Sequence, residues 1–96
     1  MREINEIDTG TDKEESDVVR DLLNRNTLML INDDFHTFDF VVDALVDVCR
    51  HDPDQAEQCA YITHYKGKCD VKRGKMSIIR PMRDRLVGKG LKVNIV

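Results

Sequence analysis

Tryptophan is absent from the 96-residue chain, and aromatic residues make up only 5% of it. Hydrophobic residues still account for 41%, which is enough for one small core. No apolar run approaches the roughly 20 residues that a membrane-spanning helix needs, and the first residues do not read as a secretory signal. We therefore expect a single small globular domain that does not enter the membrane.

The chain has three cysteines, Cys49, Cys59 and Cys69, and an odd number cannot pair completely. Without a secretory signal, this count favours reduced thiols and a cytoplasmic location. A metal site built from Cys59, His64 and His36 is disfavoured, because two residues five positions apart on a helix point about 140° apart. We expect neither a metal nor another cofactor.

The two parts of the chain differ in charge, although the net charge is only −3. Residues 1–64 carry 16 acidic and 5 basic side chains, whereas residues 65–96 carry 2 acidic and 10 basic ones. A basic C-terminal third is compatible with nucleic-acid binding; the plainer alternative is the solvated face of a small domain. Residues 1–25 are polar and acidic on balance, which predicts a disordered or weakly structured extension, and residues 26–96 then form the folded domain.

The first half of the folded domain is predicted to contain one strand and two helices. The uninterrupted apolar run Leu28–Ile31 is typical of a buried strand. An apolar stripe predicts a helix over Phe38–Arg50, with Thr37 as its N-cap. Asp52 before a proline marks the start of a second helix, which Gly67 ends. We expect these two helices to pack antiparallel across a tight corner.

The second half is predicted to add a strand, a helix and a final strand. Alternation of apolar and polar residues is weak over Cys69–Lys72 and strict over Leu91–Ile95, and both segments are interpreted as strands. Between them we expect a helix from the N-cap Ser77 to about Val87, in which Pro81 is tolerable only near the first turn. Its inner face is predicted to comprise Ile78, Ile79, Met82, Leu86 and Val87.

Hydrogen-bond acceptors gather where the first strand ends, at Asn32, Asp33 and Asp34. His64, near the end of the second predicted helix, is the obvious partner for them. An ammonium group has three donors and no acceptor, so an amide oxygen, a carboxylate and a neutral imidazole suit a cationic ligand better than a phosphate. Each residue also has a plainer interpretation: Asn32 and Asp33 as turn residues, and His64 as a complement to the helix dipole.

Two motifs in this order resemble the ClpS family, the small adaptors of Clp/Hsp100 proteases. They are Leu30–Phe35, which contains the Asn-Asp-Asp triplet, and His64–Lys68, which reads His-x-x-Gly-Lys. Asp39–Val42 and the strand after Leu91 extend the resemblance over about Thr27–Val96. The resemblance implies an α+β fold, in which a small three-stranded antiparallel sheet packs against three helices in the order β-α-α-β-α-β.

Proteins of that family bind the free α-amino group and the large hydrophobic first side chain of other proteins, and deliver them to a Clp/Hsp100 AAA+ unfoldase. The resemblance implies a monomeric, non-enzymatic adaptor of this kind. It assigns the α-amino group to Asn32, Asp33 and His64, with a less direct role for Asp34. The implied pocket for the first side chain is lined by Ile31, Phe38, Val41, Ala60, Thr63 and Leu91.

Three pocket positions depart from the family's usual residues, which leaves the preferred first residue open. Phe38 stands where a methionine usually gates the pocket, Ala60 replaces another methionine, and Thr63 replaces a valine. Because Ala60 is smaller than the usual residue, we expect bulky aromatic first residues to be accepted.

Two other functions are compatible with parts of the sequence. The Lys/Arg-rich segment Lys66–Lys92 is suited by charge to nucleic acid, but Tyr65 is its only neighbouring aromatic residue for stacking on bases. An enzyme using His64 would need a nucleophile, and no serine or cysteine lies in a recognisable catalytic setting; Ser77 is interpreted as a helix cap. A non-enzymatic peptide-binding adaptor is therefore the leading hypothesis.

Overall fold

The computed structural model of the chain describes residues 26–96. The extension predicted for residues 1–25 lies outside the described residues. The fold is α+β and has the predicted element order, and none of the helices described is long and apolar enough to span a membrane. The elements are β2 (Asn26–Ile31), α2 (Phe38–Cys49), α3 (Pro53–Lys66), β3 (Lys68–Gly74), α4 (Met76–Gly88) and β4 (Lys92–Ile95).

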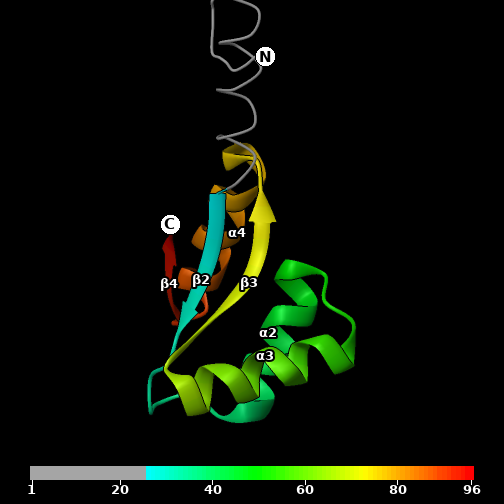
Figure 1. Ribbon diagram of the computed structural model, residues 1–96, viewed down its shortest axis with the longest axis vertical. Coiled ribbons are helices and arrows are strands. Elements are labelled where there is room, and N and C mark those ends of the chain that lie inside the picture. The colour runs from blue at the N-terminus through cyan, green and yellow to red at the C-terminus, as the bar shows by residue number, and fades with distance from the viewer. Residues whose placement is uncertain (1–25) are drawn as a thin grey trace, which may run out of the picture.

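The three strands form one antiparallel sheet in the order β3-β2-β4, so β2 lies in the centre (Figure 1). β2 pairs over its whole length with β3, and over Leu28–Ile31 with β4. The three-stranded antiparallel sheet is thus confirmed. β2 and β3 are longer than their predicted apolar segments, because backbone pairing continues through polar residues that carry no hydrophobic signal.

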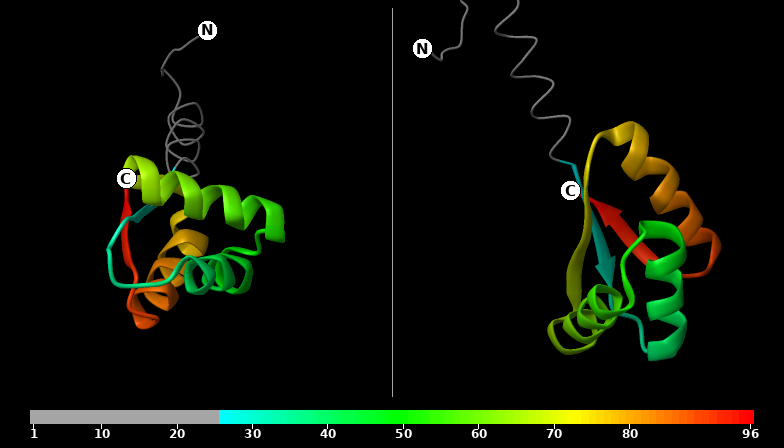
Figure 2. Two further views of the ribbon diagram at one scale, coloured as in Figure 1. Left: turned by 90° about the horizontal axis from the view of Figure 1, so that it is seen from below. Right: turned by 90° about the vertical axis from the view of Figure 1, so that its right-hand side faces the viewer.

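Helix α4 covers one face of the sheet, whereas α2 and α3 lie at the end where β2 finishes and β3 begins (Figures 1 and 2). The core lies between the sheet and these helices. Its largest fully buried side chains include Leu28, Leu30, Leu45, Ile79 and Leu86. Burial of each such side chain contributes about 1.5–3 kcal/mol, so the apolar run of β2 is central to stability.

The corner between α2 and α3 is tight, but the two helices cross one another instead of packing antiparallel as predicted (Figure 2). Arg50 turns the chain in the left-handed conformation, with φ 61°. Asp52 then caps α3 and accepts a hydrogen bond from the Gln55 amide at 2.8 Å. Lys72 of β3 donates to the Cys49 carbonyl at 3.3 Å, which ties the end of α2 to the sheet.

The pairing of β2 with β3 is irregular between Leu28 and Met29, which leaves Val71 of β3 as a β-bulge. The Val71 carbonyl accepts a hydrogen bond from Nε2 of His51 at 2.6 Å. His51 is 4% exposed, and its Nδ1 has no hydrogen-bond partner within residues 26–96. The imidazole is therefore a buried donor that joins the helical corner to the irregular strand.

Replacement of His51 with alanine is expected to lower the free energy of unfolding by about 2–4 kcal/mol. The change removes a packed ring and leaves the Val71 carbonyl buried without its donor. Urea denaturation followed by circular dichroism measures the effect. His64→Ala is the matched control, because that residue is exposed and exposed substitutions shift stability by about 0.5 kcal/mol or less. Equal losses for the two variants would contradict the structural role of His51.

The predicted N-cap of α4 is wrong, because Ser77 lies inside the helix. The N-cap is Lys75, whose side chain makes no capping hydrogen bond. Its carbonyl accepts instead from the amides of Ile78 and Ile79, both at 2.9 Å. A helix can thus begin on backbone hydrogen bonds alone, without the side-chain signal on which the prediction rested.

The inner face of α4 is narrower than predicted. Ile79 and Leu86 are fully buried, but Ile78 and Val87 are 51% and 52% exposed. Successive helical residues are rotated by about 100°. Ile78 and Val87, each next to a buried residue in the sequence, therefore fall at the edges of the buried stripe. Pro81 lies in the second turn and is exposed. It has no N–H to donate to the carbonyl of Ser77, four residues earlier, but water can reach that carbonyl.

All three cysteines are free and buried. Burial raises the pKa of Cys49 to about 11 and that of Cys69 to about 12. Because the thiolate is the reactive form, the thiols of Cys49 and Cys69 are poorly reactive at neutral pH. All three cysteines belong to the hydrophobic core, where they act as small hydrophobic residues.

Candidate functional site

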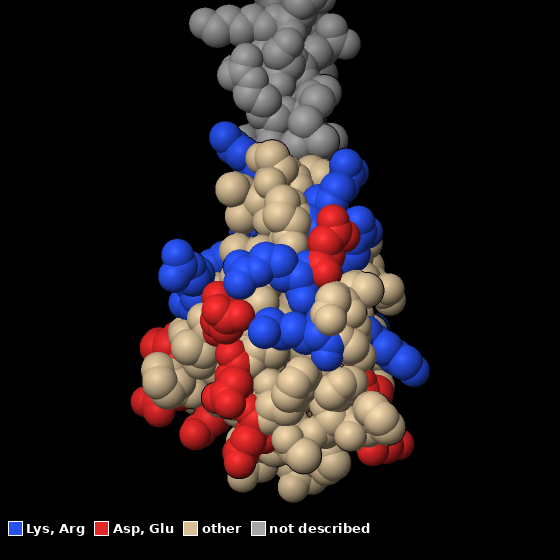
Figure 3. All heavy atoms as spheres, turned by 180° about the vertical axis from the view of Figure 1, so that it is seen from behind, with Lys and Arg blue, Asp and Glu red and all other residues tan. Residues whose placement is uncertain are grey.

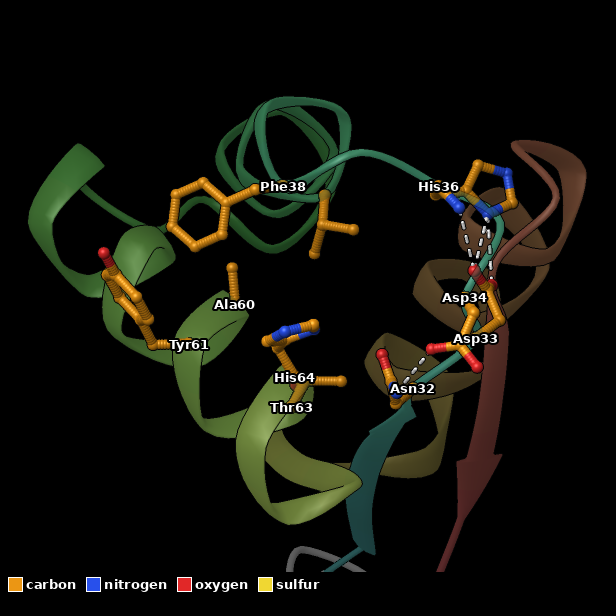
Figure 4. A pocket seen from close by; sticks show the side chains of 10 residues that line it. Asn32, Asp33, Asp34, His36, Phe38, Ala60, Tyr61, Thr63 and His64 are labelled. Carbon is orange, nitrogen blue, oxygen red and sulfur yellow. Dashed lines mark hydrogen bonds and ion pairs between the residues drawn. The ribbon is translucent and has the colours of Figure 1, made fainter.

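A pocket of about 320 Å³ opens between the end of β2, the start of α2 and the last turns of α3 (Figure 4). These three segments meet at the end of the sheet, where the chain leaves β2 and returns into β3. The residues that line the pocket are Asn32, Asp33, Asp34, His36, Phe38, Val41, Ala60, Tyr61, Thr63 and His64.

Eight of the ten site residues expected from the sequence lie in this lining, and the two exceptions are Ile31 and Leu91. Ile31 is half-buried at the end of β2. Leu91 is 4% exposed and belongs to the hydrophobic core. Leu91 and Val93 are both buried while Lys92 is exposed, so alternation along this segment directs Leu91 into the core.

Asn32 and His64 come together because the end of β2 is hydrogen-bonded to the end of α3. The Asn32 amide donates to the Gly67 carbonyl at 2.9 Å, and the Gly67 amide donates to the Thr63 carbonyl at 2.9 Å. Gly67 has φ 93°, a conformation that other residues seldom adopt. The glycine of the His-x-x-Gly-Lys motif therefore lets the chain turn directly from α3 into β3, beside the Asn-Asp-Asp triplet.

The loop Asn32–Thr37, here called the lip, forms the polar edge of the pocket. Oδ1 of Asp33 accepts hydrogen bonds from the backbone amides of Phe35 and His36, both at 3.0 Å. Nδ1 of His36 lies 3.2 and 3.1 Å from the two carboxylate oxygens. Burial acts to raise the pKa of Asp33, but the hydrogen bonds from His36 and Phe35 outweigh it and lower that pKa. Asp33 is therefore ionised at neutral pH.

Asn32 and His64 offer acceptors to a ligand. Nδ2 of Asn32 lies 3.5 Å from Oδ1 of Asp34, and the Asn32 amide oxygen points into the pocket toward the His64 side (Figure 4). Within the described part of the chain, no donor is hydrogen-bonded to this oxygen or to the His64 ring. A cation with several N–H donors would therefore find unoccupied acceptors beside two carboxylates.

The opposite end of the pocket is apolar (Figure 4). Phe38 of α2 and Tyr61 of α3 have ring centroids 4.9 Å apart, and Ala60 lies between them and His64. The Thr63 hydroxyl donates to the Cys59 carbonyl at 2.7 Å. Because that hydroxyl is satisfied within α3, Thr63 can line an apolar wall much as valine would.

Two lining residues, His36 and Tyr61, were missed by the sequence analysis. Tyr61 lies three residues before His64, a spacing that places both on one face of a helix, and this signal was sufficient to find it. His36 lies three residues after Asp33, but a loop follows no comparable spacing rule. Only the folded lip shows that the side chains of Asp33 and His36 are in contact.

Basic side chains form a band across the back of the domain, next to a cluster of acidic side chains (Figure 3). Arg85 and Lys89 of α4 lie 3.4 and 3.3 Å from Asp47 of α2. Part of the basic C-terminal third thus balances the acidic side of its own domain. The pocket lining contains no Lys or Arg, and within residues 26–96 no cluster of His, Cys, Asp or Glu could hold a metal ion.

Residues 23–94 match the family described as "ATP-dependent Clp protease adaptor protein ClpS". The chain is also 36% identical over 55 residues to the ATP-dependent Clp protease adapter protein ClpS of Salmonella gallinarum, covering 54% of this chain and 52% of that protein. The chain thus spans about half the length of the curated relative that it matches.

The fold is similar to that of Agrobacterium tumefaciens ClpS2, solved bound to L-phenylalaninamide, with a TM-score of 0.66. The match covers 77% of this chain and 96% of that one at 22% sequence identity, and at this identity it establishes a shared fold. The family match extends from before β2 into β4. It includes both motifs, the whole of each element from β2 to α4, and most of β4. The chain belongs to the ClpS family of ATP-dependent Clp protease adaptor proteins.

Proposed function

We propose that this chain binds the N-terminal residue of proteins that begin with a bulky hydrophobic amino acid, and delivers them to a Clp/Hsp100 AAA+ unfoldase. The proposal is supported by one pocket that has acceptors at one end and an apolar wall at the other (Figure 4). An N-terminal residue has two parts that complement this pocket, an ammonium group for the acceptors and a side chain for the apolar wall. Both parts are attached to one carbon. L-phenylalaninamide, the ligand of the Agrobacterium relative, has them too.

The ammonium group is held by Asn32, Asp33 and His64, and Asp34 supports them. The Asn32 oxygen and the neutral His64 ring accept N–H donors, while the carboxylates supply negative charge. A charge pair at about 4 Å and an effective dielectric near 20 contributes about 4 kcal/mol. The family membership supports the delivery step, in which the adaptor binds its cargo and catalyses no reaction.

The first side chain fills the apolar end of the pocket, whose volume of about 320 Å³ is typical of small-ligand sites. Burial of one Phe or Leu side chain contributes roughly 1.5–3 kcal/mol. Desolvation and ordering oppose these gains, whereas hydrogen bonds from the ammonium group to Asn32 and His64 add to them. We expect dissociation constants near the micromolar range, which is a binding free energy of about 8 kcal/mol. An adaptor that must release its cargo needs binding of this moderate strength.

A peptide series that differs only in its first residue tests the proposal. Peptides beginning with Phe, Tyr, Trp or Leu are expected to bind at least about 10-fold more tightly than those beginning with Gly, Ala or Asp, because only large apolar side chains fill the apolar end. Isothermal titration calorimetry gives the dissociation constants. Affinity that does not depend on the first residue would refute the proposed recognition.

A further inference from the structure

The carboxylate of Asp33 is already engaged within the lip before any ligand arrives. One oxygen accepts two backbone hydrogen bonds, and Nδ1 of His36 lies within 3.2 Å of both oxygens. The two side chains are only 12% and 15% exposed. The Asp33–His36 pair is therefore part of the internal structure of the lip, as much as it is part of the pocket surface.

The His36 ring is also held on its other sides. It stacks on Phe40 of α2, with centroids 4.8 Å apart and an interplanar angle of 25°. Gly90, which precedes β4, approaches so closely that a Cβ there would lie 3.1 Å from Nε2 of His36. His36 thus connects the lip to α2 and to the segment that leads into β4.

The lip depends on such connections because it has open space on both sides. The pocket lies on one side, and a second, shallower hollow of about 610 Å³ is lined by residues 32–36 together with Gly90 and Lys92. Phe35, on the lip, is 87% exposed. Loops with few buried contacts open readily, and an open lip would misplace Asn32 and Asp34.

We propose that His36 is a positioning residue, which holds the lip through its Nδ1 hydrogen bond to Asp33 and so presents Asn32 and Asp34 to the bound amino group. This inference rests on the proposed function of the pocket. A preorganised lip lowers the ordering cost of binding. Loss of the His36 donor therefore weakens binding while the core, which lies elsewhere, stays folded.

Two substitutions separate the donor of His36 from its ring. His36→Asn places an amide nitrogen at the position of Nδ1 and keeps the donor, whereas His36→Phe keeps the ring on Phe40 and has no donor. With L-phenylalaninamide as the probe, we expect the Asn variant to bind within about threefold of wild type and the Phe variant at least about 10-fold more weakly. The reverse order, or a Phe variant within threefold of wild type, would overturn the proposal.

A matched control and a double variant refine the test. Arg73 and Asp70 of β3 form another pair three residues apart, at 3.2 Å and outside the pocket, so Arg73→Ala should leave the affinity unchanged.

The double variant Asp33→Ala/His36→Phe should bind no more than about threefold more weakly than Asp33→Ala alone, because both changes remove the same contact. Independent, multiplicative losses would contradict the shared role.

Amide hydrogen exchange in the ligand-free protein decides the role of His36 without reference to binding. The Phe35 and His36 amides donate to Asp33. They should exchange at least about 10-fold faster in His36→Phe than in wild type or His36→Asn; unchanged rates would overturn the proposal. If the wild-type protein fails to bind L-phenylalaninamide, the proposed function of the pocket fails, and the exchange rates still decide whether His36 holds the lip.

Discussion

Asp33→Ala is expected to weaken the binding of L-phenylalaninamide by at least about 2 kcal/mol, or roughly 30-fold. The substitution removes a negative charge from the pocket and leaves the amides of Phe35 and His36 without the acceptor that shapes the lip. Calorimetric titration at pH 7 measures the loss.

Lowering the pH from 7 to 5 should not discharge Asp33. Burial acts to raise the pKa of Asp33, but hydrogen bonds hold it below its ordinary value of 3.8. A carboxyl group with a lowered pKa keeps its charge above that value and loses it only as the pH falls through the lowered pKa. Wild-type Asp33 is therefore ionised at both pH values.

Asp43→Ala is the matched control for Asp33→Ala, because Asp43 is an exposed carboxylate of α2 that does not line the pocket. We expect both variants to unfold within about 1 kcal/mol of wild type, since neither removes a core side chain. An Asp33→Ala variant with wild-type affinity at pH 7 would show that this carboxylate has no part in binding.

Ala60→Phe is expected to weaken the binding of peptides with aromatic first residues by about 2–3 kcal/mol. Ala60 projects into the pocket between Phe38 and His64 (Figure 4), so a phenyl group there takes the space that the ligand's ring would fill. A peptide beginning with leucine should lose less than one beginning with tryptophan. Competition against a fluorescent peptide measures both losses.

Ile62→Phe provides the control for this substitution. Ile62 lies on the same helix, is 40% exposed and does not line the pocket, so a phenyl group there should leave every affinity unchanged. If Ala60→Phe also binds aromatic first residues with wild-type affinity, the first side chain does not occupy the space between α2 and α3.

The sequence was sufficient where a local pattern decides the structure. The unbroken apolar run of Leu28–Ile31 predicted the central strand, and Asp52 before a proline predicted the start of α3. The pocket contains residues from far apart in the chain. Asn32 and His64 were grouped by the chemistry of their acceptors and by resemblance to a known family. Their actual link is the backbone hydrogen bond between Asn32 and Gly67, which no local pattern encodes.

The sequence was insufficient where contacts between elements decide the outcome. Leu91 was expected in the pocket, but the position of β4 beside β2 directs it into the core. The chain turns from α2 toward α3 at Arg50, which adopts the left-handed conformation. Glycine usually marks such a turn in a sequence, and none is present here. His36 was overlooked as a member of the site because its partners, Asp33 and Phe40, converge on it only in the folded lip.

The proposed function depends most on recognition of a free ammonium group by a preformed pocket. The direct test is a calorimetric titration of a peptide that begins with phenylalanine, alongside its N-acetylated twin. Acetylation removes the charge and leaves one N–H donor, but it keeps the side chain. We predict a dissociation constant near the micromolar range for the free peptide and binding at least about 100-fold weaker for the acetylated one. Equal affinities would contradict the account.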